Sequence, residues 1–213
     1  MEFLIRNTGN HDLIVILLSS CFALIVVSRF LFESRFYDFF ELLKNGKYLV
    51  IYGKNSFNYD LFNIILSGIQ LISLSIFITQ YLPVSEFFFS QSIFYCFFFL
   101  LGLIVCKYLA EKLFFIILGI EKVYDHVIFQ KITFRNLIGI LLFIINILLF
   151  WVFNFSDTII LIIAILVGLL YIATTIIVYR NHLSVILNNL FYFILYLCAL
   201  EISPYILLYK LLA

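Results

Sequence analysis

One acidic residue stands inside a long apolar stretch near the C-terminus. Glu201 lies near the middle of the run Leu190–Tyr209, and Pro204 follows it by three residues. A carboxylate at that depth in a bilayer is costly, so we expect Glu201 to be neutral or partnered and to face other helices. Proline removes a backbone donor, and broken helices beside polar groups carry ions in transporters. Two hypotheses follow: a glutamic acid bonded to a neighbouring helix or subunit, which we favour, and an ion or proton relay.

Two amide side chains, Asn146 and Gln70, also lie within apolar runs. Ser67, Ser73 and Ser75 share the run that contains Gln70. Amides and hydroxyls in membrane helices commonly form hydrogen bonds between helices, and each such bond contributes about 1 kcal/mol. We therefore favour a role for these side chains in hydrogen bonds between helices over a role in binding a ligand.

The other residues that could do chemistry are not arranged for it. His11, His126 and His182 are far apart, and none has a second histidine, cysteine or carboxylate at convincing metal-ligand spacing. The four cysteines form no C-x-x-C pair, and the chain contains no G-x-S-x-G, H-E-x-x-H, P-loop or G-x-G-x-x-G motif. We predict no catalytic residue, no metal site and no cofactor.

The elements that position these residues are six apolar runs. Roughly 20 apolar residues in a helix cross the hydrocarbon core of a bilayer. With 65% apolar residues in 213, the chain leaves no room for a separate soluble domain. We predict an all-α polytopic membrane protein, with residues 1–213 forming a single transmembrane helical domain. The predicted spans are Leu13–Ser28, Leu61–Leu82, Phe87–Cys106, Leu137–Phe153, Thr158–Tyr179 and Leu190–Tyr209.

The basic residues predict how these spans are oriented. Of the 13 lysines and arginines, all except Arg6 and Lys210 fall in the first, third and fifth connections. Basic connections stay on the cytoplasmic side during insertion, so both termini are expected on the outer side. The net charge of +1, without a basic patch interleaved with aromatics, argues against nucleic acid as a partner.

The first cytoplasmic connection, residues 29–60, carries an aromatic helix pattern. Phe36, Tyr37, Phe40 and Leu43 recur at helical spacing, which predicts an amphipathic helix. Such a helix directly after a span lies most simply in the membrane interface, and a docking face for a partner is the alternative. The following run Tyr48–Tyr52 is β-prone and predicts a short hairpin-like turn.

The second long connection, residues 107–136, is more highly charged. Lys107 and Glu111 stand one helical turn apart as an attractive pair. The apolar run Leu113–Ile120 is too short to span, and we expect the third helix to bend there along the interface. Both long connections together predict a cytoplasmic contact surface for lipid headgroups or a partner. Its candidate residues are Arg35, Phe36, Phe40, Lys107, Lys112, Lys122, Arg180 and His182.

The C-terminal stretch Asn189–Lys210 carries a family resemblance. The pattern Phe-Tyr-x-x-Leu-Tyr-x-Cys-x-Leu-Glu-x-x-Pro runs from Phe191 to Pro204 without departure. In this motif, and in its size and multi-span character, the chain resembles a family of uncharacterised integral membrane proteins of Bacteroidota. That family is classed as a domain of unknown function, and its genes often neighbour uroporphyrinogen-III synthase. The resemblance implies a bacterial inner-membrane location and brings no assigned activity.

We therefore expect a non-enzymatic accessory or scaffold subunit of an inner-membrane complex, serving protein export or envelope biogenesis. Its expected partners are the lipid bilayer and other inner-membrane proteins, translocase subunits among them. The alternative is a small proton-coupled transporter or channel that uses Glu201. A membrane enzyme acting on lipid or a tetrapyrrole is a third and weaker hypothesis.

Overall fold

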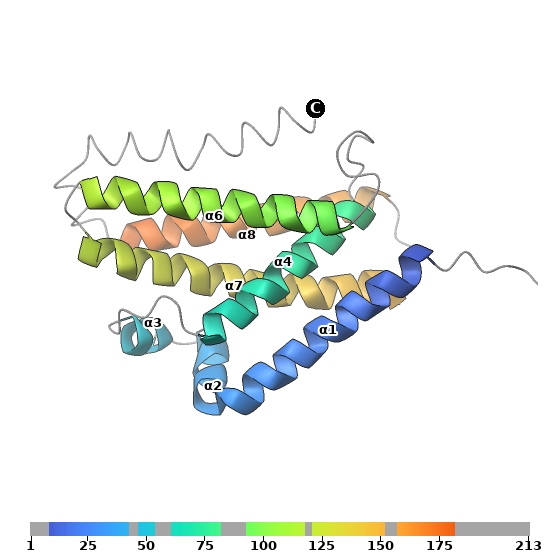
Figure 1. Cartoon of the computed structure of the whole chain (residues 1–213), viewed down its shortest axis with the longest axis horizontal. Coiled ribbons are helices and arrows are strands. Elements are labelled where there is room, and N and C mark those ends of the chain that lie inside the picture. Colours follow the sequence, from blue (N-terminus) through green and yellow to red (C-terminus); the bar gives the residue numbers. More distant parts are fainter. Residues whose placement is uncertain are drawn as a thin grey trace, which may run out of the picture.

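The computed structural model describes residues 9–42, 47–53, 61–81, 93–117, 121–151 and 157–181. All regular structure within these ranges is helical, which confirms the predicted all-α class for this part of the chain. The helices are α1 (Gly9–Leu31), α2 (Glu33–Glu41), α3 (Lys47–Tyr52), α4 (Leu61–Tyr81), α6 (Ile93–Ile117), α7 (Glu121–Trp151) and α8 (Asp157–Asn181) (Figure 1).

Five helices, α1, α4, α6, α7 and α8, are long and apolar enough to cross a membrane. They overlap the first five predicted spans. The sixth predicted span, Leu190–Tyr209, lies outside the described residues, and so do Glu201, Pro204 and the whole of residues 182–213.

Helices α4 and α7 form the centre of the bundle. About half of each membrane-length window is buried, 56% in α4 and 50% in α7, against 22% in α1, 11% in α6 and 6% in α8. Helix α4 packs most extensively on α7 and also contacts α1 and α6, whereas α8 packs on α7 (Figure 1). The outer helices therefore present most of their apolar surface away from the protein, as lipid-facing helices do.

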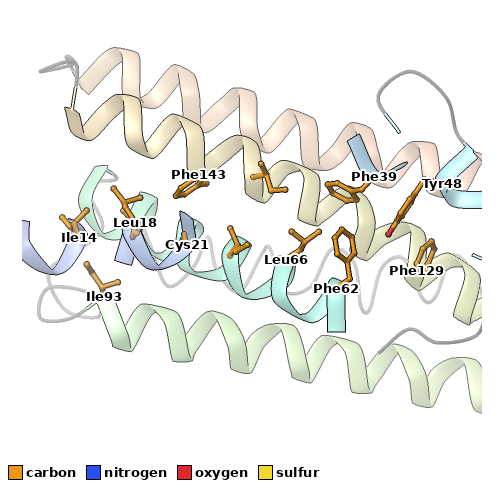
Figure 2. Close-up of a cluster of buried hydrophobic side chains, with 13 residues drawn as sticks. Ile14, Leu18, Cys21, Phe39, Tyr48, Phe62, Leu66, Ile93, Phe129 and Phe143 are labelled. Atoms are coloured by element: carbon orange, nitrogen blue, oxygen red, sulfur yellow. The ribbon is translucent and has the colours of Figure 1, made fainter. Parts of the chain in front are cut away.

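The main apolar core follows this central pair. Figure 2 shows it running from Ile14 and Ile93 at one end to an aromatic group of Phe39, Tyr48 and Phe129 at the other. In the aromatic group, the Phe39 ring meets the Tyr48 ring edge-on at 5.7 Å between centroids, and Tyr48 stacks on Phe129 at 5.9 Å. Edge-to-face and offset contacts at these distances are favourable beyond simple area burial. The aromatic group ties α2 and α3 to the bundle.

The first long connection differs from its prediction in two respects. Helix α2 is present, but its fully buried ring is Phe39, which the predicted aromatic stripe left out. Tyr37 is 69% exposed and Phe40 is 41% exposed. Helical spacing alone predicts a face with Phe36, Tyr37 and Phe40, whereas the packing of α2 against the bundle buries Phe39.

The second difference is that residues 47–52 form helix α3, so the predicted hairpin-like turn at Tyr48–Tyr52 is wrong. Helical spacing places Tyr48 and Tyr52 one turn apart, with their ring centroids 4.9 Å from each other. Tyr48 also reaches Phe39 and Phe129 from this position. Tertiary packing of the tyrosines has overridden the local strand propensity of the run.

The second long connection is shorter than predicted. Helix α6 continues past Cys106 to Ile117 without a break, and α7 begins at Glu121, well before Leu137. At about 1.5 Å per residue, α7 with its 31 residues is longer than the roughly 30 Å hydrocarbon core. Its charged first turns can therefore project beyond the bilayer while remaining helical.

Candidate functional site: a polar seam between α4 and α7

A line of polar side chains runs along the contact between α4 and α7. We call it the polar seam and define it by Asn63, Ser67, Gln70 and Ser73 on α4 and by Gln130, Thr133, Asn136 and Asn146 on α7. The members on α4 are separated by three or four residues, which places side chains on one face of a helix, whereas on α7 Asn146 follows Asn136 by ten residues. The sequence therefore shows which polar side chains of α4 share a face. Which side chains of α7 lie opposite them depends on how the two helices pack.

Asn136 joins the two helices near one end of the seam. The hydroxyl of Ser67 donates to Asn136 Oδ1 at 3.1 Å, and Asn136 Nδ2 donates to the carbonyl oxygen of Asn63 at 3.4 Å. Both polar atoms of the Asn136 side chain are thus partnered, and the residue is fully buried. Bonds of this kind between membrane helices stabilise a specific register.

Gln70 occupies the middle of the seam and reaches a third helix. Its Nε2 donates to the hydroxyl oxygen of Tyr171 on α8 at 2.7 Å. On the other side of Gln70, Gly139 of α7 comes so near that a Cβ there would lie 2.5 Å from Gln70 Cβ. Glycine is the residue that allows such a close approach of backbones.

Asn146 forms the last contact of the seam. Its Nδ2 donates to the carbonyl oxygen of Ser73 at 2.8 Å, and the asparagine is fully buried. The partners advance together along both helices, from Asn63 with Asn136 to Ser73 with Asn146. Helices α4 and α7 therefore run in the same direction, as two spans with one span, α6, between them in sequence must.

Several buried polar atoms of the seam have no hydrogen-bond partner among the described residues. They are Asn63 Oδ1 and Nδ2, Gln70 Oε1, Ser73 Oγ, Gln130 Oε1 and Asn146 Oδ1. Leaving a buried donor or acceptor unsatisfied costs about 1–3 kcal/mol, so native proteins rarely contain many such atoms without a protein or water partner.

The end of the seam nearest α3 carries the titratable groups. His126 Nδ1 lies 3.0 Å from the carbonyl oxygen of Gly53. A carbonyl oxygen only accepts, so Nδ1 carries the proton in this bond. His126 Nε2 lies 3.4 Å from Gln130 Nε2. The histidine thus links the end of α3 to α7.

An ion pair between α6 and α7 lies at the same end of the bundle. Lys131 Nζ is 3.4 Å from Glu111 Oε1, and the two side chains are only 17% and 5% exposed. A charge pair with so little solvent is costly to break, because a mostly buried charge loses an oppositely charged neighbour. The sequence had paired Glu111 with Lys107 along one helix, whereas this contact joins two helices.

The aromatic cap, which we define as α2 and α3, has its own polar contacts. The Arg35 guanidinium lies 4.6 Å from the centre of the Tyr52 ring and 5.9 Å from that of Phe62. The Tyr52 hydroxyl donates to Asp38 Oδ2 at 3.0 Å. Burial, followed by the hydrogen bond to Asp38 and its charge, raises the pKa of the Tyr52 phenol, and the charge of Arg35 acts in the opposite direction.

The predicted contact residues are spread over the ends of several helices. Phe36 and Phe40 lie together on α2, with ring centroids 5.0 Å apart. Lys112 near the end of α6 and Arg180 near the end of α8 are exposed. The remaining predicted residues are Lys107 on α6, Lys122 on α7, whose side chain is not described, and His182, Glu201 and Pro204, which lie outside the described ranges.

Sequence reasoning missed Asn63, Gln130, Thr133 and Asn136 as members of the polar seam, and it missed Gly139 and Tyr171 as contacts of Gln70. Asn136 was assigned to a cytoplasmic connection because the fourth span was drawn to begin at Leu137. The available signal was the shared face of Asn63, Ser67 and Gln70 on α4. Nothing local indicated which residues of α7 and α8 would meet that face.

The fold and the seam define the class of protein: a polytopic membrane protein built from helices, with polar contacts inside an apolar bundle. Within the described residues, no group of three or more histidine, cysteine, aspartate or glutamate side chains is placed to hold a metal ion. The chain belongs to the family described as a domain of unknown function, DUF4271, whose model matches residues 14–212. No curated protein and no solved structure matches the chain.

Proposed function

We propose that this protein is a non-enzymatic accessory or scaffold subunit of a bacterial inner-membrane complex that serves protein export or envelope biogenesis. The observation that carries the proposal is an aromatic cap that is anchored to the bundle and also exposes apolar side chains. A surface of this kind suits the docking of another subunit.

The anchor of the aromatic cap is its buried side. Phe39 contacts Phe62 of α4 with ring centroids 5.8 Å apart, and Tyr48 stacks on Phe129 of α7. Both Phe39 and Tyr48 are essentially inaccessible. The cap is therefore held in one orientation by two helices of the central pair.

The outward side of the aromatic cap is apolar in several places. Tyr37, Phe40 and Ile51 are 69%, 41% and 54% exposed. Aromatic side chains are enriched in protein interfaces, and a surface that is already ordered loses less entropy on binding. The same side chains could also contact the membrane interface, and the two roles are compatible.

The proposal includes a topology of six spans with both termini on the periplasmic side and residues 190–209 as the sixth span. Arg29 lies in the last turn of α1, the aromatic cap follows, and the Glu111–Lys131 pair joins α6 to α7. His126 on α7 contacts Gly53 at the end of α3. The basic connections thus gather at one end of the bundle, which supports placing that end in the cytoplasm. The family resemblance in residues 189–210 supports a Bacteroidota origin.

Purification of the tagged native protein in mild detergent, with mass spectrometry of co-eluting proteins, tests the proposal. We expect stoichiometric membrane subunits, and we expect Tyr37→Ser combined with Phe40→Ser to lose them at unchanged protein level. Ile165→Ala combined with Leu169→Ala is the matched control, since both residues are similarly exposed on α8. A partner-free 25.1 kDa protein or homo-oligomer would contradict the proposal.

A second candidate function is a small proton-coupled transporter or channel that uses Glu201. The acidic residue within the apolar run Leu190–Tyr209 favours it, because ionisable residues at membrane depth commonly mark ion or proton routes. In reconstituted vesicles, Glu201→Gln should abolish an ion-dependent flux without lowering the protein level. Glu33→Gln on the exposed side of α2 should leave the flux intact. Equal flux in wild type and Glu201→Gln would exclude this candidate.

A further inference from the structure

Four of the six unpartnered atoms of the polar seam lie at two places, one at Asn63 and one at Ser73 with Asn146, and the other two are Gln70 Oε1 and Gln130 Oε1. Asn63 is 2% exposed, and neither its Oδ1 nor its Nδ2 has a partner among the described residues. Deeper along the seam, Ser73 Oγ and Asn146 Oδ1 are both unpartnered, and the two residues are adjacent because Asn146 Nδ2 bonds to the Ser73 carbonyl oxygen. Buried groups of this kind normally bind ordered water or a ligand.

The chemistry of these atoms selects the ligand. Asn63 offers an amide donor and a carbonyl acceptor, while Ser73 has a hydroxyl that can donate or accept. A metal cation would satisfy only the oxygens, and the seam as defined contains no carboxylate to compensate its charge. Water satisfies donors and acceptors together, and a water molecule with two to four polar partners is the usual occupant of such a site.

The contact between Gln70 and Gly139 separates the two places. Gln70 lies between Asn63 and Ser73 along α4, and its Nε2 is already bonded to Tyr171. A Cβ at Gly139 would lie 2.6 Å from Gln70 Cγ and 2.8 Å from Gln70 Cα, so the two helices touch there. No water molecule fits between Gly139 and Gln70 at this contact.

We propose that the polar seam binds ordered water at two separate internal sites, one at Asn63 and one between Ser73 and Asn146. The Gln70–Gly139 contact closes the seam between them. In this arrangement, the bound water completes the hydrogen bonds of the central helix pair.

Water-edited solid-state NMR of the full chain in lipid bilayers tests this proposal through side-chain amides labelled with ¹⁵N. We expect magnetisation from water to reach the amides of Asn63 and Asn146 several-fold faster than the amide of Asn136. Asn136 is the matched control, because it is equally buried in the same seam and both of its polar atoms have protein partners. Equally slow transfer to all three would overturn the proposal, and so would equally fast transfer to all three.

A variant tests whether the two sites are separate. Asn146→Leu should leave the transfer to Asn63 unchanged, whereas loss of transfer at Asn63 would contradict separate sites. If the leucine is not tolerated, Ser73→Ala removes one hydroxyl only. Ser73→Ala should slow the transfer of magnetisation from water to Asn146 and leave the transfer to Asn63 unchanged. Unchanged transfer to Asn146 would contradict a water site between Ser73 and Asn146.

Discussion

Gly139 of α7 lies directly against Gln70 of α4, at the middle of the central helix pair. A Cβ atom on Gly139 would stand 2.5 Å from Gln70 Cβ and 2.8 Å from Gln70 Cα. The second distance matters most, because a backbone atom cannot turn aside as a flexible side chain can. The hydrogen bond from Gln70 to Tyr171 also joins α8 to this point, so three helices meet at Gln70.

Gly139→Ala should therefore destabilise the protein although alanine favours helices. Forcing extra atoms into a packed contact costs about 1–3 kcal/mol, and here the two helices must move apart. Thermal unfolding in detergent measures the loss. Gly168→Ala is the control, since no atom lies within 4 Å of a Cβ at Gly168, and it should be neutral or slightly stabilising. Equal midpoints for the two variants would contradict the close contact.

Glu111→Gln should destabilise the protein, because it removes the carboxylate that lies 3.4 Å from the largely buried charge of Lys131. Breaking such a pair costs about 3 kcal/mol, whereas removing both charges costs much less. A double-mutant cycle with Lys131→Gln, followed by thermal unfolding, measures the coupling. Additive effects of the two substitutions would show that the 3.4 Å contact contributes nothing specific.

Phe39→Ala should destabilise the aromatic cap much more than Phe40→Ala, because Phe39 lies on its buried side and Phe40 on its exposed side. Truncating a fully buried phenylalanine costs about 3–5 kcal/mol, because contacts are lost and a cavity remains. Phe40 is 41% exposed, and its truncation should cost far less stability. Limited proteolysis within residues 33–53 reports the loosening of the cap. Greater cleavage in Phe40→Ala than in Phe39→Ala would reverse the assignment of the two rings.

The stability of the aromatic cap should fall at alkaline pH through Tyr52. Its pKa is raised above the usual 10.0, so the folded state holds the phenol proton more tightly than the unfolded state does. The resulting stabilisation is present below the usual pKa and is lost as the pH rises through the folded-state pKa. Unfolding midpoints between pH 8 and roughly pH 11 should therefore decline less in Tyr52→Phe than in wild type. Parallel declines in both proteins would contradict this assignment.

The sequence by itself determined the class of the protein and most of its long helices. Apolar length and the absence of charge are local properties, so α1, α4 and α8 could be recognised near their true bounds. The ends of α6 and α7 were harder, because their charged turns are helical but lie beyond the apolar run. The buried amides Gln70 and Asn146 could also be selected, since a polar side chain within an apolar run stands out in any sequence.

Only the tertiary structure decided which residues meet. Asn136 bonds to Ser67, Glu111 pairs with Lys131, and Gln70 reaches Tyr171 across separations of 20 to 101 residues. Phe39 became the buried ring of α2, and residues 47–52 became helical, because neighbouring helices offered packing there. Such partners depend on how helices cross and which faces they turn to each other. That geometry is set by the free energy of the whole bundle, so it cannot be predicted from a local pattern of residues.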